Sequence, residues 1–480
     1  MPLHQHYING EWLTSSKTRD NINPSDPSEV IGEYCEADAQ DAALAVQAAQ
    51  VAFPIWSRST PQQRFDALDF IGTEILARKQ ELGTLLAREE GKILPEAIGE
   101  VARAGYIFKY FAGEALRMAG QLLASVRPHI EVLTSREAVG VVALITPWNF
   151  PIAIPAWKCA PALACGNSVV LKPSEFTPGC AWALAEIISR AGLPKGAFNL
   201  LMGDGVAGRA LVEHSGVNAI SFTGSTNTGR TIAQHCAQGI GQTHKKYQLE
   251  MGGKNPLIIL DDSDLNVALD CAVNGAFFST GQRCTASSRT IVTEKIYSQF
   301  MQAFVASTAA LKVGAAIESS SQIGPVVNQA QLEKNLRYIG IGQEESGQLL
   351  VGGQRIATLG AGYFFSPAII ENHNPQARLN QEEVFGPVST LIKVKDFEEA
   401  ISVANATPYG LSAGICTTSL KYATQFRREM QAGMVMVNAP TAGVDYHVPF
   451  GGTKASSIGP REQGSMAMEF YTTVKTHYIA

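Results

Sequence analysis

The sequence lacks an apolar run that could cross a membrane, because no hydrophobic stretch reaches the roughly 20 residues that a spanning helix needs. An excess of basic residues is also missing: 38 lysines and arginines stand against 43 aspartates and glutamates, for a net charge of −5. This balance offers no electrostatic attraction for nucleic acid or an anionic membrane. The opening residues, MPLHQHYINGEWL, lack the basic and then apolar layout of a signal peptide. We therefore expect a soluble cytoplasmic protein with no nucleic-acid or membrane partner.

Paired cysteines are absent as well. The eight cysteines form no CxxC pair, and no histidines stand at the spacing of a zinc site, so we expect no metal. In a large cytoplasmic chain they should be reduced thiols, most of them small buried side chains. Cys284, in TGQRCTASSR, differs because it lies among small and hydroxyl-bearing residues directly after an arginine. Its own neighbourhood leaves two alternatives, a buried space-filler and a nucleophile.

Repeats and low-complexity linkers are missing too, so the 480 residues should divide into two or three compact domains. The early region is helical. Thr60 and Pro61 are suited to an N-cap and first turn, and apolar residues follow at helical spacing from Leu68 to Leu86. We predict that this helical stretch ends at Gly91.

Short apolar strands then alternate with helices, which is typical of a parallel α/β sheet. The first series of predicted strands is AVGVVALIT, NSVVLKPS, GAFNLLMG, AISFTGS and NPLIIL, and the second is SSRTIVTE, SPAIIEN, VSTLIKV, LSAGICT and GMVMVN. We place a domain boundary near Met251-Gly252-Gly253. The terminal AMEFYTTVKTHYIA is interpreted as a strand that reaches out of the second domain, an edge suited to subunit pairing.

One glycine-rich segment fits the dinucleotide fingerprint, Gly203-Asp-Gly-Val-Ala-Gly208, between a strand and a helix. The acid expected about 20 residues later is missing, since that region contains SFTGS. A tight strand-to-helix turn explains the glycines as well as phosphate contact does.

A second candidate for a phosphate site follows one unit later. Gly224 and Ser225 lie between a buried strand and a helix predicted to begin near Asn227, where free amides and the helix dipole attract a pyrophosphate. Lys172 and Glu175 follow the strand NSVVL, at the sheet edge where ligands bind, and either side chain can hydrogen-bond ribose hydroxyls. A surface salt bridge is the alternative for that pair, but two such loops on successive strands favour a cofactor.

Two further residues supply what a cysteine nucleophile needs, a base and an oxyanion donor. Glu250 ends a predicted strand in apolar company, where burial would raise its pKa, although a glutamate facing water is an equal alternative. Asn149 lies in a turn between Pro147 and Pro151 with its amide free to donate, and an ordinary turn asparagine is the simpler local interpretation.

Taken together, these motifs resemble the aldehyde dehydrogenase superfamily over essentially the whole chain. The thiol signature is matched by FFSTGQRC, ending at Cys284, and the glutamate signature by LEMGGKNP at Leu249–Pro256. PWNFP, KPSE, FTGST, EEVFGP and PFGGTKASSIG occur in the family's order. The resemblance implies an α/β fold with a Rossmann-type cofactor domain (1–119 and 141–250), an α/β catalytic domain (251–448) and a small β oligomerisation domain (120–140 and 466–480).

The resemblance also implies the site. Cys284 is expected to be the nucleophile, Glu250 the general base and Asn149 the oxyanion donor. NAD is expected as cofactor, with NADP as an alternative, and an aldehyde as substrate; a homodimer or homotetramer is expected. The implied cofactor contacts are Trp148, Asn149, Lys172, Pro173, Ser174, Glu175, Gly205, Gly224, Ser225, Met251, Glu383 and Phe385. The expected substrate contacts are Trp157, Phe150, Arg283, Thr285 and Phe450.

Within the superfamily the chain is most similar to 2-oxoglutarate semialdehyde (2,5-dioxovalerate) dehydrogenases, and next to succinate semialdehyde dehydrogenases. The carboxylate-binding arginines of the latter would fall at Trp157 and Phe278, and neither side chain can pair with a carboxylate. Arg283 is the nearest remaining candidate, and bracing the Cys284 loop is its alternative role. The presence of Glu250 disfavours a coenzyme-A-acylating enzyme, and the intact thiol, base and amide disfavour a non-catalytic protein of this fold.

Overall fold

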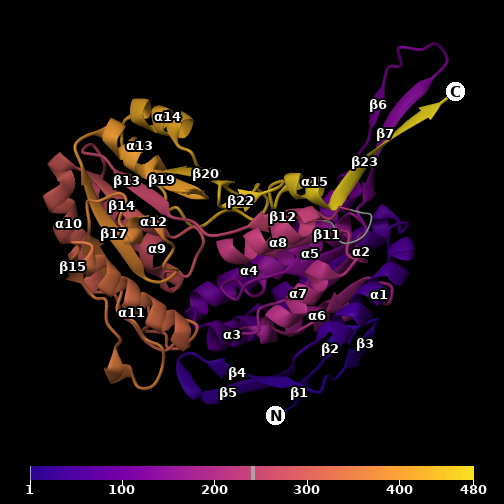
Figure 1. Ribbon diagram of the computed structural model, residues 1–480, viewed down its shortest axis with the longest axis horizontal. Helices are drawn as coiled ribbons and strands as arrows, with labels where there is room; N and C mark the ends of the chain where they lie inside the picture. Colours follow the sequence, from indigo (N-terminus) through magenta and orange to yellow (C-terminus); the bar gives the residue numbers. More distant parts are fainter. Residues whose placement is uncertain (1, 239–243) are drawn as a thin grey trace.

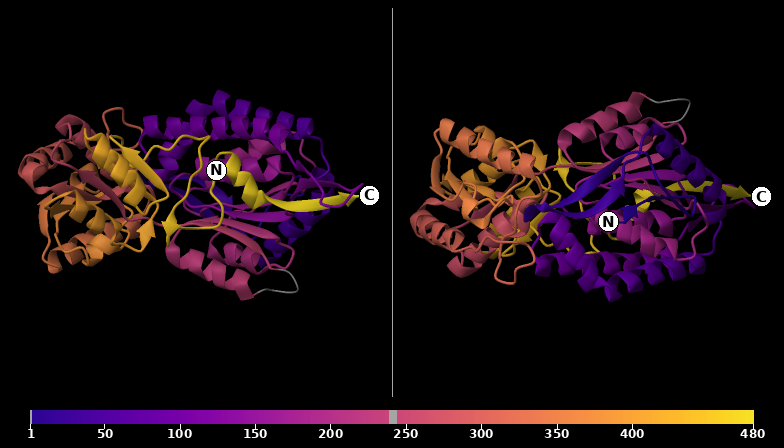
Figure 2. Two further views of the ribbon diagram at one scale, coloured as in Figure 1. Left: turned by 90° about the horizontal axis from the view of Figure 1, so that it is seen from above. Right: turned by 90° about the horizontal axis from the view of Figure 1, so that it is seen from below.

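The computed structural model describes residues 2–238 and 244–480, and these form two α/β bodies and a projecting β arm (Figure 1). Each body is built on its own sheet, and the C-terminal part of the chain returns from the second body to the first (Figures 1 and 2). No helix in the described ranges is long and apolar enough to cross a membrane.

The first body contains an eight-stranded sheet of order β22-β12-β11-β8-β9-β10-β2-β3. Its five central strands are parallel, and the outer strands β22, β2 and β3 are antiparallel to their neighbours. The bounds are β2 His6–Ile8, β3 Glu11–Leu13, β8 Val141–Ile145, β9 Ser168–Lys172, β10 Phe198–Leu200, β11 Ala219–Thr223, β12 Lys246–Glu250 and β22 Ser457–Ile458. Four predicted strands of the first series are therefore confirmed in this sheet, whereas the fifth, NPLIIL, forms β13 (Asn255–Ile259) of the second sheet.

Helices cover both faces of this sheet, which explains why its central strands are apolar at every position. Val142 and Leu144 pack into one core, and Val141 and Ala143 into the core on the opposite face. The helices are α1 Ala39–Trp56, α2 Pro61–Ala77, α3 Lys79–Glu90, α4 Leu94–Arg117, α5 Ala153–Ala164, α6 Pro178–Ser189, α7 Gly205–Glu213 and α8 Thr226–Gln238. A small sheet of β1 Leu3–His4, β4 Thr18–Asn23 and β5 Asp26–Cys35 lies at the N-terminal side.

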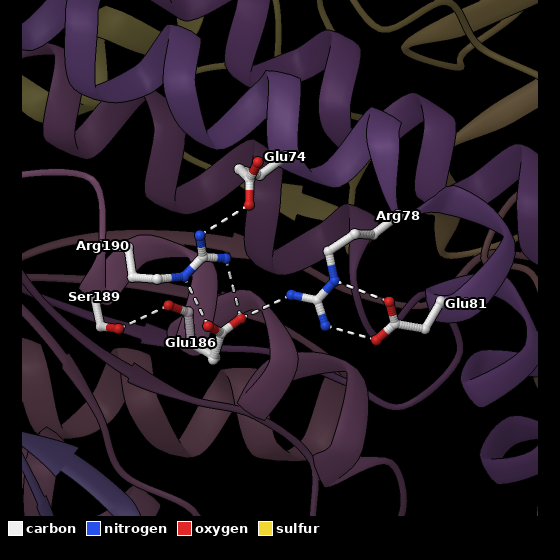
Figure 3. Close-up of polar contacts among 6 residues, drawn as sticks. All are labelled: Glu74, Arg78, Glu81, Glu186, Ser189 and Arg190. Carbon is white, nitrogen blue, oxygen red and sulfur yellow. Dashed lines mark hydrogen bonds and ion pairs between the residues drawn. The ribbon is translucent and has the colours of Figure 1, made fainter.

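The helical stretch predicted from Thr60 to Gly91 is two helices. Thr60 caps α2 with a reciprocal Gln63 contact, and Gly91 ends α3 in the left-handed conformation, so both predicted ends are confirmed. The uninterrupted helix is wrong, because it breaks at Arg78. The Arg78 guanidinium pairs with Glu81 of α3 and with Glu186 of α6, which Arg190 also contacts (Figure 3). These tertiary contacts fix the turn at a place where the apolar spacing shows no interruption.

The second body has a seven-stranded sheet of order β15-β16-β17-β14-β13-β19-β20, parallel except for β15. Its strands are β13 Asn255–Ile259, β14 Ser287–Thr293, β15 Gln348–Val351, β16 Ala368–Glu371, β17 Val388–Val394, β19 Ser412–Cys416 and β20 Met434–Val437. Its helices are α9 Leu265–Phe277, α10 Glu294–Ala309, α11 Gln329–Glu344, α12 Arg378–Gln381, α13 Phe397–Asn405 and α14 Leu420–Glu429. The predicted second series is confirmed, and a short ladder of β18 Tyr409–Gly410 with β21 Thr453–Lys454 lies beside it.

The arm consists of β6 Gln121–Leu123, β7 Glu131–Ala138 and β23 Thr472–Ile479. β23 runs antiparallel to β7 over its whole length, from Thr472 opposite Ala138 to Ile479 opposite Glu131. Figure 1 shows this arm projecting from the first body beyond its helices. The prediction of one strand over AMEFYTTVKTHYIA is wrong at its start, because α15, Met468–Tyr471, precedes β23. Met468, Phe470 and Tyr471 are buried in the first body, so local packing there favours a helical turn. The expectation that the terminal strand reaches out of the second domain is therefore wrong, because this packing and the pairing with β7 place it on the first body.

Candidate active site

A cavity of about 660 Å³ opens at the carboxyl ends of the parallel strands of the first sheet. Strand order reverses around β8, since β9 and β10 follow on one side and β11 and β12 on the other. This switch point is where doubly wound sheets bind nucleotides. The turns after β8, β9 and β11 and the start of α7 all contribute to its wall. The cavity therefore has the position and the size of a dinucleotide site.

The loop after β9 supplies three polar groups to this cavity, from Lys172, Ser174 and Glu175. The Lys172 ammonium donates to the Gly203 carbonyl at 2.5 Å and lies 3.9 Å from the Glu175 carboxylate. Burial lowers the pKa of Lys172. Pro173 lies in the same loop but is not part of the cavity wall. Lys172 and Glu175 therefore lie close enough to pair with each other, as the salt-bridge alternative expects, and they also line the cavity.

Both glycine motifs also reach this cavity. Gly205 and Gly208 lie on its wall from the start of α7, where Asp204 caps the helix. Gly224 and Ser225 lie on the cavity wall directly after β11, and the Gly224 backbone N–H donates to the Glu250 backbone carbonyl at 3.0 Å. The Ser225 hydroxyl accepts from the Thr228 amide at 3.2 Å, so it caps α8, which begins at Thr226. The free N–H groups of that first turn face an anion site.

A second cavity of about 200 Å³ shares Trp148, Gly224 and Ser225 with the first and contains Cys284. The shared wall makes one groove that extends from Glu175 to the thiol. Among the predicted residues, Trp148, Asn149, Met251, Glu383 and Phe385 line the second cavity together with Cys284. Residues 149, 284 and 383 are thus brought to one place by the fold.

The Cys284 loop is held in a strained conformation. Ser279 and Thr280 have φ angles of 51° and 55°, in the left-handed region that non-glycine residues avoid. The carboxylate of Glu96 from α4 accepts from the Ser279 backbone N–H at 3.1 Å. The side-chain Nδ2 of Asn255 donates to the Cys284 backbone carbonyl at 2.8 Å. Contacts from both bodies therefore fix the position of the thiol.

Cys284 is partly buried, and the other seven cysteines are fully buried. Burial of its sulfur and the nearby carboxylates of Glu383 and Glu250 raise the pKa of Cys284 to about 12, while the backbone N–H groups of Cys284 and Thr285 lower it. Those two amides approach the sulfur, so they can also stabilise negative charge formed beside it. A thiol with this pKa is protonated at neutral pH and needs a base to react.

Glu250 is buried at the end of β12, with 2% of its surface exposed, so a glutamate facing water is excluded. One carboxylate oxygen accepts from the Ser457 hydroxyl at 2.6 Å, and the other has no hydrogen-bond donor from residues 2–238 or 244–480. Desolvation and the neighbouring Glu462 carboxylate raise the pKa of Glu250 well above its ordinary range. Glu462 in turn pairs with the buried Lys158.

Asn149 is held by its main chain and by one amide hydrogen. Its Nδ2 donates to the Gln282 carbonyl at 3.0 Å, and its carbonyl accepts from the Lys92 ammonium at 2.8 Å. Lys92 also forms a buried ion pair with Glu100 at 2.6 Å. One of the two Nδ2 hydrogens is therefore occupied, which differs from the freely donating amide expected, and the other remains for a ligand.

Glu383 and Phe385 form the far wall of the second cavity. The Gly253 amide donates to the Glu383 carboxylate at 3.0 Å, and a side chain at Gly252 would meet that carboxylate at 2.4 Å. The Phe385 ring stands edge-on to Trp148, with 5.3 Å between ring centroids. The glycine pair after β12 therefore allows close approach of Glu383.

Trp157 and Phe450 stack with ring centroids 5.4 Å apart, and Cys284 packs against the cluster that contains Phe450. Thr285 is buried next to the thiol, and Phe150 packs under the Lys92 ammonium at 3.9 Å.

Arg283 is not brought to the thiol cavity. Its guanidinium donates to the Asn274 carbonyl of α9 and lines a separate small cavity with Ser288. This placement favours the bracing role over substrate contact.

Several residues of the groove carried no sequence signal. Gln331 and Lys334 reach the second cavity from α11, and Ser457 reaches Glu250 from β22. Gln331 and Lys334 come from a segment that no motif marks, whereas Ser457 lies within the motif PFGGTKASSIG, which gave no sign of its contact with Glu250.

Two mostly parallel sheets, with a groove that leads from a nucleotide-type site to the Cys284 thiol, define the class of protein as a nucleotide-binding α/β enzyme. The family model described as "Aldehyde dehydrogenase family" matches residues 12–477, and the chain belongs to that family. The expected fold is confirmed, and the protein is an oxidoreductase acting on aldehydes.

The similar proteins are also named as dehydrogenases of aldehydes. An alpha-ketoglutaric semialdehyde dehydrogenase of Bacillus subtilis is 42% identical, over 99% of this chain and 97% of its own length. A 2,5-dioxopentanoate dehydrogenase of Saccharolobus solfataricus is 40% identical over 95% of each chain. The structure of a betaine aldehyde dehydrogenase of Staphylococcus aureus in complex with NAD+ matches with a TM-score of 0.96 at 36% identity, over 99% of this chain and 94% of that one.

Proposed function

We propose that the protein oxidises 2-oxoglutarate semialdehyde to 2-oxoglutarate with NAD+. The observation that carries this proposal is the groove that joins the Glu175 loop to Cys284, with Asn149 on the wall beside the thiol. Glu250 is not part of that wall, but its carboxylate is near enough to raise the pKa of Cys284. The substrate is supported by the two relatives above, whose names specify this semialdehyde. Alternatives are succinate semialdehyde and a broad range of neutral aldehydes, and a phenylacetaldehyde dehydrogenase of Pseudomonas fluorescens at 39% identity represents the latter.

The first half-reaction forms a bond between the Cys284 sulfur and the aldehyde carbon. Burial keeps the Cys284 thiol protonated, so its proton must pass to solvent water before the sulfur attacks. The aldehyde oxygen of the resulting thiohemiacetal gains negative charge, which the remaining Asn149 amide hydrogen and a backbone N–H near Cys284 stabilise. NAD+, when bound in the groove, accepts the hydride that turns the thiohemiacetal into a thioester.

The second half-reaction hydrolyses the thioester. Glu250 takes a proton from water, the hydroxide attacks the thioester carbon, and the carbon–sulfur bond breaks to release the acid and the Cys284 thiolate. The free Glu250 oxygen faces no competing donor in the described part of the chain, which suits it to a water molecule. A non-catalytic protein of this fold has no reason to keep these three groups together.

The first cavity fits the adenosine end of the cofactor. Glu175 and Lys172 are proposed to contact the ribose, Gly224 and Ser225 the pyrophosphate, and Glu383 and Phe385 the nicotinamide ribose. A carboxylate at Glu175 accepts from a free 2′-hydroxyl and repels a 2′-phosphate, so NAD+ should be preferred over NADP+. In Glu175→Ser the ratio of the two kcat/KM values should move toward NADP+. Equal use of both cofactors, unchanged by the substitution, would show that Glu175 does not face the ribose.

We also propose that residues 1–119 with 141–250 bind the cofactor, that residues 251–448 form the catalytic domain, and that 120–140 with 466–480 join subunits of a cytoplasmic homodimer or homotetramer. The separate sheets and the projecting arm support this division.

The test of the function is NADH formation from NAD+ and 2-oxoglutarate semialdehyde without any added thiol acceptor. We expect steady turnover by the wild type and none by Cys284→Ala, which should keep its fold by circular dichroism. Turnover by Cys284→Ala within tenfold of wild type would exclude the thiol mechanism, and dependence on coenzyme A would indicate an acylating enzyme instead.

A further inference from the structure

Arg103, on α4, is a cation without a carboxylate partner among the ion pairs of residues 2–238 and 244–480. Its Nη2 donates to the Gln463 side-chain oxygen at 3.0 Å. Its Nε is buried and meets no acceptor from the described residues. Buried donors of a guanidinium are almost always paired, so this arrangement needs a reason.

Two neighbouring side chains also have a buried donor without an acceptor among the described residues. Trp157 Nε1 and Gln463 Nε2 are buried and likewise lack an acceptor within the described ranges. The Arg103 guanidinium carbon lies 5.9 Å from the Trp157 ring centroid, and Gln463 is its hydrogen-bond partner. Arg103 thus lies beside two side chains that, like it, each have a buried donor without an acceptor among the described residues.

These donors connect directly to the surroundings of the thiol. Trp157 stacks on Phe450, and Cys284 packs against the cluster that contains Phe450. Glu462, next to Gln463, forms two backbone hydrogen bonds with Phe450, of 2.6 and 2.8 Å. The three donors are not among the wall residues of the two cofactor cavities.

We propose that Arg103, with Trp157 and Gln463, binds the distal carboxylate of the substrate. This inference rests on the proposed function, which requires a five-carbon aldehyde with a carboxylate at its far end. The planar guanidinium can donate two parallel hydrogen bonds to a carboxylate, which a neutral aldehyde cannot use. The positive charge of this proposed carboxylate site comes from Arg103 on α4. Position 157 on α5 holds a tryptophan, which carries no charge.

The nearby carboxylates leave Arg103 available. Glu100 is committed to Lys92 and to the amides of Ile152 and Ala153. Asp445 is exposed and forms no ion pair with the described residues. Burial lowers the pKa of Arg103, whereas Glu100, Asp445 and the Cys284 sulfur raise it, which also places its charge within electrostatic range of the thiol. A guanidinium stays protonated under these conditions.

The first experiment compares steady-state kinetics of Arg103→Gln and Arg103→Lys with wild type, using 2-oxoglutarate semialdehyde and pentanal. In Arg103→Gln, KM for the semialdehyde should rise roughly tenfold or more, while kcat/KM for pentanal should stay within about twofold. Arg103→Lys should recover part of the loss, since it keeps the charge without the fork. The matched control is Arg117→Gln, which removes an exposed charge from the same helix and should change neither substrate.

The second experiment separates the anion site from the natural substrate. Glutarate should inhibit pentanal oxidation competitively in the wild type, and its inhibition constant should rise roughly tenfold or more in Arg103→Gln. If the wild type does not turn over 2-oxoglutarate semialdehyde but glutarate inhibition depends on Arg103, the proposed substrate fails and the anion site stands. Equal glutarate inhibition of both proteins, or an equal loss with acidic and neutral aldehydes, would overturn the inference.

Discussion

At the scale of single residues, burial has different consequences for the carboxyl groups of Glu250 and Glu90. Glu250 has one oxygen that accepts from Ser457 and one without a protein donor in the described part of the chain, and it lies near the Cys284 thiol. Glu90 is fully buried at the end of α3, and neither of its oxygens has a donor within residues 2–238 or 244–480. The first is suited to proton transfer, and the second lowers stability when it ionises.

Replacing Glu250 with glutamine removes the proposed base and keeps the thiol and its loop. We expect deacylation to slow far more than acylation, because attack by water needs a base in the second half-reaction. In a rapid-mixing experiment, Glu250→Gln should show a burst of NADH close to one per active site, followed by a very slow steady rate. Loss of the burst would mean that Glu250 already acts on the Cys284 proton.

The pH dependence of turnover follows from the same group. Since the pKa of Glu250 is raised, its basic form increases as pH rises through that pKa, and the wild-type kcat should rise with it. In Glu250→Gln this limb of the pH profile should disappear. An identical limb in both proteins would assign the titration to another group.

Glu90 makes a stability prediction. Burial raises its pKa from 4.5 to about 8, with Glu100 and Glu96 acting in the same direction and Lys92 against it. Because the folded pKa exceeds the unfolded one, the stabilising effect is complete below about pH 4.5 and is lost as pH rises through 8. As pH rises from 5 to 8, the Tm of wild type should therefore fall relative to the Tm of Glu90→Gln.

The control for that experiment is Glu398→Gln, which changes an exposed glutamate. Its Tm should stay parallel to that of wild type across the same range. A Tm difference between Glu90→Gln and wild type that is constant with pH would show that Glu90 is ionised in the folded protein.

At the scale of elements, the thiol is placed by a turn between α9 and β14. The left-handed residues Ser279, Thr280 and Gly281 reverse the chain, Glu96 holds the turn from α4, and Arg283 joins it to the end of α9. Deformation at any of these contacts moves the sulfur relative to Asn149.

Arg283→Ala tests the bracing role. Removal of the guanidinium takes away the bond to the Asn274 carbonyl, so Tm should fall, and kcat/KM should decrease by the same factor for 2-oxoglutarate semialdehyde and pentanal. The pattern should thus differ from that of Arg103→Gln. A rise in KM confined to the acidic aldehyde would instead restore Arg283 as its carboxylate partner.

At the scale of the whole molecule, the β arm projects from the first body (Figure 1). Several of its apolar side chains are exposed. Val474 and Tyr478 of β23 are each 62% exposed, and Leu122 of β6 is 78% exposed. An apolar, projecting set of strands is the type of surface that another subunit covers.

Val474→Lys with Tyr478→Lys should therefore weaken subunit association. Light scattering coupled to size-exclusion chromatography should give a larger mass than one chain of 51.4 kDa for the wild type and a smaller assembly for the double variant. The burst of NADH should persist in the variant, since the arm lies away from the groove. An unchanged mass would exclude the arm as the subunit contact.

Most of the site could be predicted from the sequence, because it lies in local motifs at strand ends. Apolar strands followed by KPSE, FTGST and LEMGG put Glu175, Gly224 and Glu250 at the edge of a parallel sheet, and chain order alone brings such ends together. The alternation of strands and helices likewise determined the two parallel sheets, since each strand needs helices on both faces.

Only the tertiary structure decided where charges and turns act. The helix break at Arg78 follows from Glu186, 108 residues away, and the Arg103–Gln463 contact joins positions 360 residues apart. Arg283 is adjacent to Cys284 in sequence yet faces α9, because the left-handed turn before it directs the side chain away from the groove. Hydrophobic periodicity and motifs specify local conformation, whereas long side chains take partners from whichever segment packing brings near, and no local pattern encodes that choice.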